Sequence, residues 1–227
     1  MNPAVDRPMA DVRDVPVLHT VLDRELGLLP QAVRGVPPGD VRRVAAVADH
    51  IALVCSLLHR HHRGQDLLLW PLLAARAGHA AAAVVPVMRE QHRLMEGVRS
   101  EVDRHLRDWR STARSGGELA SAIERLTHRA VRHHALEEKE ILPLGARHVT
   151  AAEWAGLAEH TFAGHDTKSL TVSLGMLAYE AGPRAAKGLL TGAPLAARLL
   201  IPVIARRAYA SRARRIHGTA RPSHRDT

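Results

Sequence analysis

A short pattern occurs twice in the chain, and both copies place polar side chains on an otherwise apolar helix. Residues 60–72 read RHHRGQDLLLWPL and residues 132–144 read RHHALEEKEILPL. In each copy a histidine pair is followed by an amide or a carboxylate four residues after its first member, and by a proline ten residues after it. Residues four apart share one face of an α-helix, so the pattern pairs His61 with Gln65 and His133 with Glu137.

Each copy interrupts an apolar stripe that has helical spacing. Residues at steps of three and four are apolar over 44–58 before the first copy and over 123–130 before the second. We expect Leu68 and Leu72 to continue the first stripe, and Leu144 to continue the second. The histidine of each copy therefore belongs to the face that a helix buries.

Two further stripes contain one histidine each. His19 lies within the apolar spacing of residues 15–29, and His92 lies within that of residues 88–109. From His19 to the first copy is 42 residues and from His92 to the second is 41, so the chain contains an approximate repeat of a helix pair. Four amphipathic helices with this repeat predict an antiparallel bundle of pseudo-twofold symmetry.

Helix-breaking and capping residues mark the limits of these helices. Residues 27–40 end the first helix, and Asp40 is suited to cap the second. Pro86 is suited to the first turn of the third helix, residues 111–117 precede the fourth, and Thr150 can begin a capping box after it.

Composition agrees with helices, because aromatic residues make up 3% of the chain and no run of β-branched residues alternates with polar ones. We predict an all-α fold with an up-down four-helix bundle over residues 14–147. A flexible N-terminus (1–13) precedes it, and a helical extension with a basic tail (148–227) follows it.

The net charge of +9 lies in the tail. Residues 183–227 contain ten lysines or arginines and one acid, whereas the preceding residues balance. We expect an amphipathic tail helix that packs on the bundle, with contact to an anionic membrane surface as the alternative. The scarcity of aromatic residues and the lack of a base-reading motif argue against nucleic acid. The oligomeric state is not predicted.

Other features bear on the compartment. Cys55 is the only cysteine, which excludes a disulfide within one chain and favours a reducing, cytoplasmic setting. Prolines and an arginine interrupt the apolar stretch at residues 189–205, so we do not predict a membrane-spanning helix there.

The buried histidines indicate a metal. Several imidazoles and a carboxylate in a leucine-rich seam are unfavourable unless they are paired or coordinate an ion. Imidazole suits iron, zinc, copper and nickel, and a carboxylate adds charge and can bridge two ions. Taken singly, His19 or His92 would more simply be a hydrogen-bonded core histidine, and His50 is interpreted in that way. Four histidines in register favour a metal.

The two copies, together with LHTVLDREL (18–26) before the first and EQHRLMEGV (90–98) before the second, resemble the hemerythrin-like (HHE cation-binding) family. The resemblance covers roughly residues 14–147. It implies a bundle with a non-haem di-iron site, and with dioxygen, nitric oxide or peroxide as the small ligand, for sensing, storage or protection. The metal ligands that it implies are His19, His61, His92, His133, Glu137 and, in place of a bridging glutamate, Gln65.

Gln65 leaves the metal stoichiometry open. A glutamine offers one neutral oxygen, whereas a glutamate offers two anionic ones. We consider two ions with Gln65 or Asp66 as ligand, one ion (iron or another transition metal) held by the other half, or a bundle without metal. His62 and His134 are interpreted as flanking groups, and Asp66 and Glu138 as acceptors for the outer imidazole protons.

Two functional classes follow from a metal-binding bundle. The first is a protein that binds dioxygen or a related small ligand. The second is an oxidative enzyme that uses the metal to activate dioxygen on an organic substrate, for which a substrate pocket would have to lie beside an open metal position. A third interpretation is a structural or membrane-surface adaptor that has lost its metal.

Overall fold

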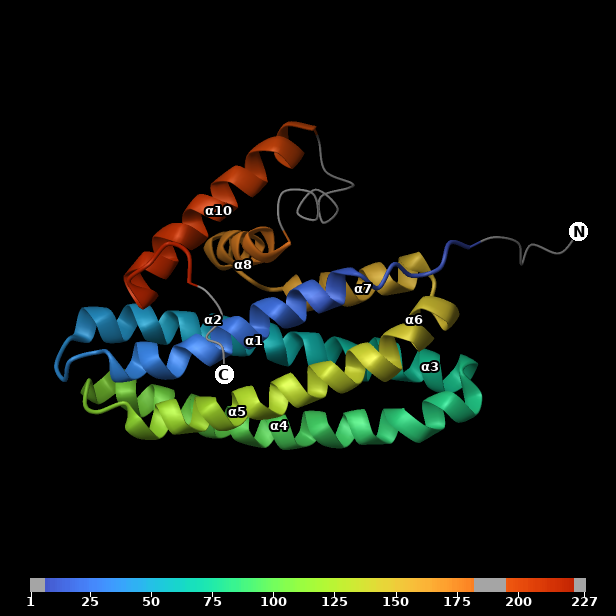
Figure 1. The fold of residues 1–227 in the computed structure, drawn as a ribbon, viewed down its shortest axis with the longest axis horizontal. Helices are drawn as coiled ribbons and strands as arrows, with labels where there is room; N and C mark the ends of the chain where they lie inside the picture. The colour runs from blue at the N-terminus through green and yellow to red at the C-terminus, as the bar shows by residue number, and fades with distance from the viewer. Residues whose placement is uncertain (1–6, 182–194, 223–227) are drawn as a thin grey trace, which may run out of the picture.

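The computed structural model describes residues 7–181 and 195–222. Four long helices lie side by side (Figure 1), and each packs on two of the others, α1 and α4 on α2 and α5. They confirm the predicted all-α bundle. Their bounds are α1 (Asp14–Arg34), α2 (Val41–Gly64), α4 (Gly78–Thr112) and α5 (Gly117–Leu136).

Two five-residue π-helical segments interrupt the bundle at equivalent places. Segment η1 (Gln65–Leu69) connects α2 to α3 (Trp70–Arg76), and η2 (Glu137–Ile141) connects α5 to α6 (Leu142–His148). A proline at the start of α3 and of α6 follows each segment. Proline cannot donate a backbone hydrogen bond and clashes with the carbonyl four residues before it, and a widened turn relieves both problems. The two copies of the sequence pattern therefore also share a π-helical turn before their proline.

The π turn shifts the buried face by one residue. The prediction that Leu68 and Leu72 continue the apolar stripe was wrong, because Leu68 is exposed and Leu72 is only partly buried. Leu69 and Leu73 are fully buried instead. A π turn holds an additional residue, so a series counted at α-helical spacing is out of phase after it.

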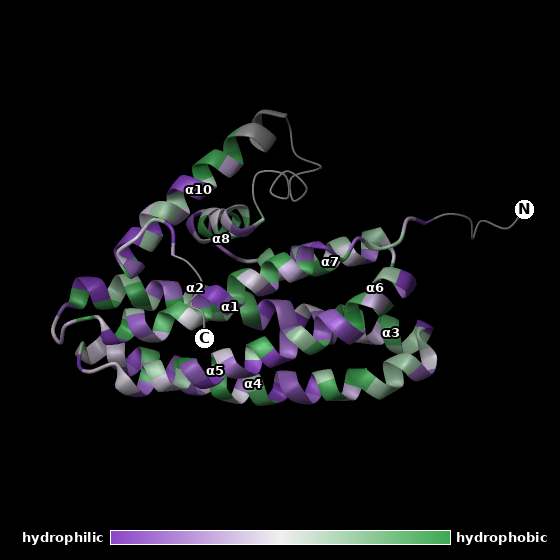
Figure 2. Cartoon of the chain, in the orientation of Figure 1, coloured by the Kyte–Doolittle hydropathy of each residue, from purple (hydrophilic) through white to green (hydrophobic). Residues whose placement is uncertain are grey.

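The remaining stripes are buried as predicted. The apolar residues at steps of three and four over 44–58 and 123–130 all lie in the core, and Leu144 lies in a second apolar cluster beyond the π segments. Apolar and polar residues alternate along each bundle helix (Figure 2), which is the pattern of helices that bury one face.

The predicted helix ends are partly right. The Asp40 side chain accepts a hydrogen bond from the Arg43 backbone at 3.0 Å, as expected of a cap. Helix α1 continues through Pro30 and ends at Arg34, within the predicted range 27–40. Pro86 was wrongly placed in a first turn, because α4 begins eight residues earlier. The alanines at 80–83, which are strong helix formers, extend the helix backward.

The C-terminal extension packs along one side of the bundle. It comprises α7 (Ala151–Phe162), α8 (Thr167–Glu180) and α10 (Leu195–His217), and Figure 1 shows them above the long helices. Helix α7 contacts α2 and η1, while α8 contacts α1 and supports α10. The capping box of Thr150 and Glu153 that begins α7 is present as predicted.

Helices α8 and α10 cross at very close range. A Cβ atom placed on Gly175 of α8 would lie 2.1 Å from the backbone oxygen of Ala205 and 2.7 Å from Cβ of Tyr209, both in α10. Only a glycine allows this approach. Arg24 of α1 is buried below the crossing, where its guanidinium lies over the rings of Tyr179 and Tyr209.

The described part of the N-terminal segment is tied to the start of α7. The Ala10 backbone donates to the Val149 carbonyl at 2.9 Å, and the Ala151 backbone donates to that of Pro8 at 2.8 Å. Residues 1–6 of the segment predicted to be flexible lie outside the described residues, as do residues 189–194 of the interrupted apolar stretch at 189–205. Within the described ranges, no helix is long and apolar enough to cross a membrane.

Candidate metal centre

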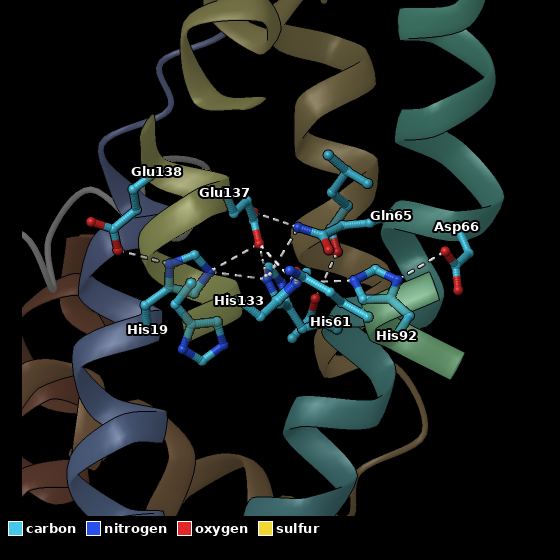
Figure 3. Close-up of polar contacts among 12 residues, drawn as sticks. His19, His61, Gln65, Asp66, His92, His133, Glu137 and Glu138 are labelled. Carbon is cyan, nitrogen blue, oxygen red and sulfur yellow. Dashed lines mark hydrogen bonds and ion pairs between the residues drawn. The ribbon is translucent and has the colours of Figure 1, made fainter. Parts of the chain in front are cut away.

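The predicted ligand residues meet in the middle of the bundle, where Figure 3 shows them converging. Every one of these side chains is at least 94% buried. Each comes from a different element, so the centre exists only when the bundle has assembled. The contributions are His19 from α1, His61 from α2, Gln65 from η1, His92 from α4, His133 from α5 and Glu137 from η2.

One group of atoms gathers between α1, α2 and η2. Oε2 of Glu137 lies 3.4 Å from Nε2 of His19 and 3.7 Å from Nε2 of His61. The two imidazole nitrogens are 3.3 Å apart. One nitrogen from each histidine and one carboxylate oxygen therefore surround a common point.

A second group lies on the α4 and α5 side. Nε2 of His92 and Nε2 of His133 are 3.1 Å apart, and a ring nitrogen of His62 lies within 4.8 Å of both rings' ligand atoms. Nε2 of His133 is also 3.5 Å from Oε2 of Glu137. The same carboxylate oxygen thus borders both groups, which is the arrangement of a bridging ligand between two ions.

Hydrogen bonds on the outer side of the rings fix their orientation. Nδ1 of His19 donates to Glu138 at 2.8 Å, and Nδ1 of His92 donates to Asp66 at 2.9 Å. These contacts confirm the outer role predicted for both acids. Each of these outer acids, which we call anchors, connects the two helix pairs. Asp66 belongs to the first pair and accepts from a histidine of the second, whereas Glu138 belongs to the second pair and accepts from a histidine of the first.

The anchors leave lone pairs directed inward. Nδ1 of His133 donates to the side-chain oxygen of Gln91 at 2.8 Å. A neutral imidazole that donates through Nδ1 presents an acceptor at Nε2. His92 and His133 therefore face each other through Nε2 at 3.1 Å, and when both rings are neutral the two lone pairs repel unless a proton or a metal ion lies between them. This geometry fits a metal ion.

Gln65 occupies the position opposite Glu137. Its amide nitrogen donates to Oε1 of Glu137 at 2.5 Å and lies 3.2 Å from Nε2 of His61. The amide oxygen of Gln65 and Oε2 of Glu137 are buried without a hydrogen-bond partner. Both are the oxygens that an ion would use. Asp66 points away, toward His92 and the indole nitrogen of Trp70, so it does not take the place of Gln65.

The charges of the centre depend on one another. Burial opposes ionisation of Glu137, but the charge of His19 and the nearby ring nitrogens of His133, His19 and His61 hold the pKa of Glu137 well below its usual range. Burial opposes protonation of His19 as well, yet the charge of Glu137 and the contact with Glu138 raise the pKa of His19 to about 9. A single buried carboxylate thus attracts positive charge, which a metal ion would supply more fully.

The second histidine of each pair, His62 or His134, lies closer to the centre than we predicted from the sequence. His62 stacks on His92 with ring centroids 4.3 Å apart, and His134 stacks on His19 at 4.0 Å. Nε2 of both stacking rings is buried without a partner. A helix inside a bundle buries a stripe at least 100° wide, which includes two consecutive residues. His62 joins the second group, a role that its position beside the seam did not indicate.

A partly open pocket with a cavity of about 40 Å³ borders the Gln65 side of the centre. His61 and Gln65 form its inner wall, and the other lining side chains are mostly apolar. Helices α7 and α8 supply half of the lining, so the extension closes this side of the centre. Their lining residues are Trp154, Leu157, Ala158, Thr161, Phe162 and Leu177.

Comparison with known families gives one match. Residues 12–145, which include every residue of both atom groups, match the family model described as "Hemerythrin HHE cation binding domain". Comparisons with curated proteins and with solved structures gave no match. The extension that closes the pocket lies outside the matched range.

Proposed function

Because the chain belongs to the hemerythrin HHE cation-binding family, we propose that its bundle holds non-haem iron and binds dioxygen or a related small ligand there. Two ions fit the two atom groups, with Glu137 between them. Bound iron would supply an open coordination position for the small ligand. The residues that would hold it are His19, His61, Gln65, His62, His92, His133 and Glu137.

The opposed nitrogens of His92 and His133 carry this proposal. Both rings are held by hydrogen bonds on their outer side, both are buried, and their Nε2 atoms face each other at 3.1 Å. A hydrogen-bonded core histidine has no need of this arrangement. Gln65 makes one bridging position neutral, so the centre has one anion fewer than two glutamates would provide.

The pocket beside Gln65 favours a small ligand over an organic substrate. A cavity of about 40 Å³ accommodates a diatomic molecule, whereas sites for organic ligands measure roughly 300–1,000 Å³. Its apolar walls favour uncharged dioxygen or nitric oxide. These features support binding of a small ligand on this side of the centre. An open pocket of about 530 Å³, lined by His62 and His92 on the other side, has the size that the alternative of an oxidative enzyme requires.

Metal analysis and absorption spectra test the proposal. Protein purified under iron-replete conditions should contain close to two equivalents of iron, and its spectrum should change on addition of azide or nitric oxide. One equivalent would mean that a single group is filled. Absence of iron after anaerobic reconstitution would contradict the proposal.

The outer anchors make a first prediction. The changes Asp66→Asn and Glu138→Gln should each lower iron affinity by about 10–100-fold, because outer acceptors orient the imidazole and increase its basicity. Iron competition with a chelator measures the effect. Glu140→Gln, in the same segment as Glu138, is the control and should leave affinity unchanged. Equal affinities in all three variants would refute the anchoring role.

A second prediction concerns the pocket. The change Ala158→Leu should fill the cavity and weaken nitric oxide binding by about 10–100-fold, because overpacking costs roughly 1–3 kcal/mol. Iron content should stay unchanged, since Ala158 does not touch the ligand atoms. Ala155→Leu, on the exposed face of the same helix, is the control. Unaltered nitric oxide affinity in the Ala158 variant would show that the ligand enters elsewhere.

Contact of the tail with an anionic membrane surface stays a prediction. Exposed Leu200, Val203 and Ile204 lie beside exposed Arg206 and Arg207 on α10, which supports such a contact. Residues 182–194 and 223–227 of the basic tail lie outside the described residues.

A further inference from the structure

A second cluster of ligand-type side chains lies where the extension meets the bundle. Glu25 of α1, His50 of α2 and His217, the last residue of α10, each direct one atom to a common point, and these atoms lie within 4.8 Å of one another. Glu25 is six residues beyond His19, so about 9 Å of helix separates the cluster from the bundle centre. The two share no residue.

The two oxygens of Glu25 have different surroundings. Oε1 accepts hydrogen bonds from the Tyr209 hydroxyl at 2.6 Å and from Arg24 at 2.7 Å. Oε2 faces the histidines, 2.8 Å from Nε2 of His50 and 3.6 Å from Nε2 of His217. One oxygen is thus fixed from outside, as an outer partner fixes a metal ligand, and the other is directed at two imidazoles.

His217 faces Glu25 without a hydrogen bond from its Nε2. Its side chain is 94% buried. The separation of 3.6 Å from Glu25 is too long for a hydrogen bond. It is close to the distance of about 3.4 Å between two ligands of one tetrahedral zinc ion. His50 would need to move from Glu25 by about 0.6 Å to match.

The charges allow a cation. Arg24 is the nearest positive group, and its charge is shared with Glu180 of α8. Burial lowers the pKa of His50 and keeps its imidazole neutral, although Glu25 acts in the opposite direction. Two imidazoles and one carboxylate are a ligand set that binds zinc. Arg212 is also close to His50, so an ion here would be held less tightly than in the bundle centre.

We propose that Glu25, His50 and His217 form a second site for a divalent transition ion of the zinc type, which fastens α10 to the bundle. The three ligands come from positions 25, 50 and 217, so the ion joins the end of the chain to its beginning. Gly218, at φ +74°, ends α10 directly after His217 and fixes where its side chain lies. Binding energy at such a site stabilises the folded state of the extension.

Zinc titration of the full chain tests this site in a background where the bundle centre is weakened. In the Glu137→Gln protein, one equivalent of zinc should bind through His217 at the second site, and the melting temperature should rise as this site fills. Adding His217→Gln should abolish both the binding of this zinc ion and the increase in melting temperature that it causes. His79→Gln, at an exposed histidine of α4, is the control and should change neither.

Cobalt provides a second measurement. Co²⁺ in the Glu137→Gln protein should give visible absorption bands of a low-coordinate ion, and these should disappear with His217→Gln while far-ultraviolet circular dichroism shows unchanged helix content. Equal zinc stoichiometry and equal melting shifts with and without His217 would overturn the proposal. Loss of iron from the wild-type bundle would not affect this outcome, so the two metal proposals fail separately.

Discussion

Glutamine in place of Glu137 is expected to lower the affinity of the bundle for iron by about 100-fold or more, which corresponds to roughly 3 kcal/mol. Glu137 is the only carboxylate whose oxygen borders both atom groups among the described residues. The substitution keeps the shape and removes the charge, so it separates electrostatics from packing. Iron content after dialysis and chelator competition measure the loss.

The reverse change sharpens this test. Gln65→Glu would place a second carboxylate within 2.5 Å of the first, in the position of the present amide contact. Like charges at that distance oppose folding without metal and attract metal strongly. We expect the variant to melt lower as the metal-free protein and to hold ferric iron about tenfold more tightly. If Glu137→Gln retained its iron and Gln65→Glu gained none, the bridging role would be rejected.

A single added methyl group at Gly175 is expected to destabilise the chain by about 3 kcal/mol. The Cβ of Gly175→Ala would overlap the backbone oxygen of Ala205, and a backbone atom of a packed helix cannot turn aside as a flexible side chain does. Helices α8 and α10 must therefore separate. Chemical denaturation followed by circular dichroism measures the change in the free energy of unfolding.

Gly156→Ala is the matched control for this experiment. Gly156 lies in α7, and the Cβ of an alanine there would have no neighbouring atom within 4 Å, so the substitution should stabilise the helix by about 0.5–1 kcal/mol. Opposite signs for the two substitutions would confirm the close crossing. Similar small effects in both would show that α8 and α10 are not in contact in solution.

The bundle and much of its core could be predicted from periodicity alone. The stripe from Val44 to Leu58 and the histidines in register with it follow from helical spacing, which depends only on neighbouring residues. The failures occur where the spacing changes. The π turn before Pro71 shifted the buried residues to Leu69 and Leu73, and no local rule shows in advance how a helix will absorb a proline.

The candidate centre could be predicted less completely. The spacing of four residues placed His133 and Glu137 on one helix face. The burial of His62, however, depends on how wide a stripe the assembled bundle buries. The cluster of Glu25 with His217 could not be predicted, because it depends on where α10 lies on the bundle. Contacts between residues almost two hundred positions apart leave no periodic signal in either helix.

The crossed anchors have a consequence for the order of assembly. Asp66 sets the tautomer of His92, and Glu138 sets that of His19, so each helix pair depends on the other for its correctly protonated ligands. A helix pair made alone would contain the histidines without a fixed lone pair. On the proposed function, ion binding would therefore follow association of the two helix pairs, and the metal would stabilise a bundle that has already assembled.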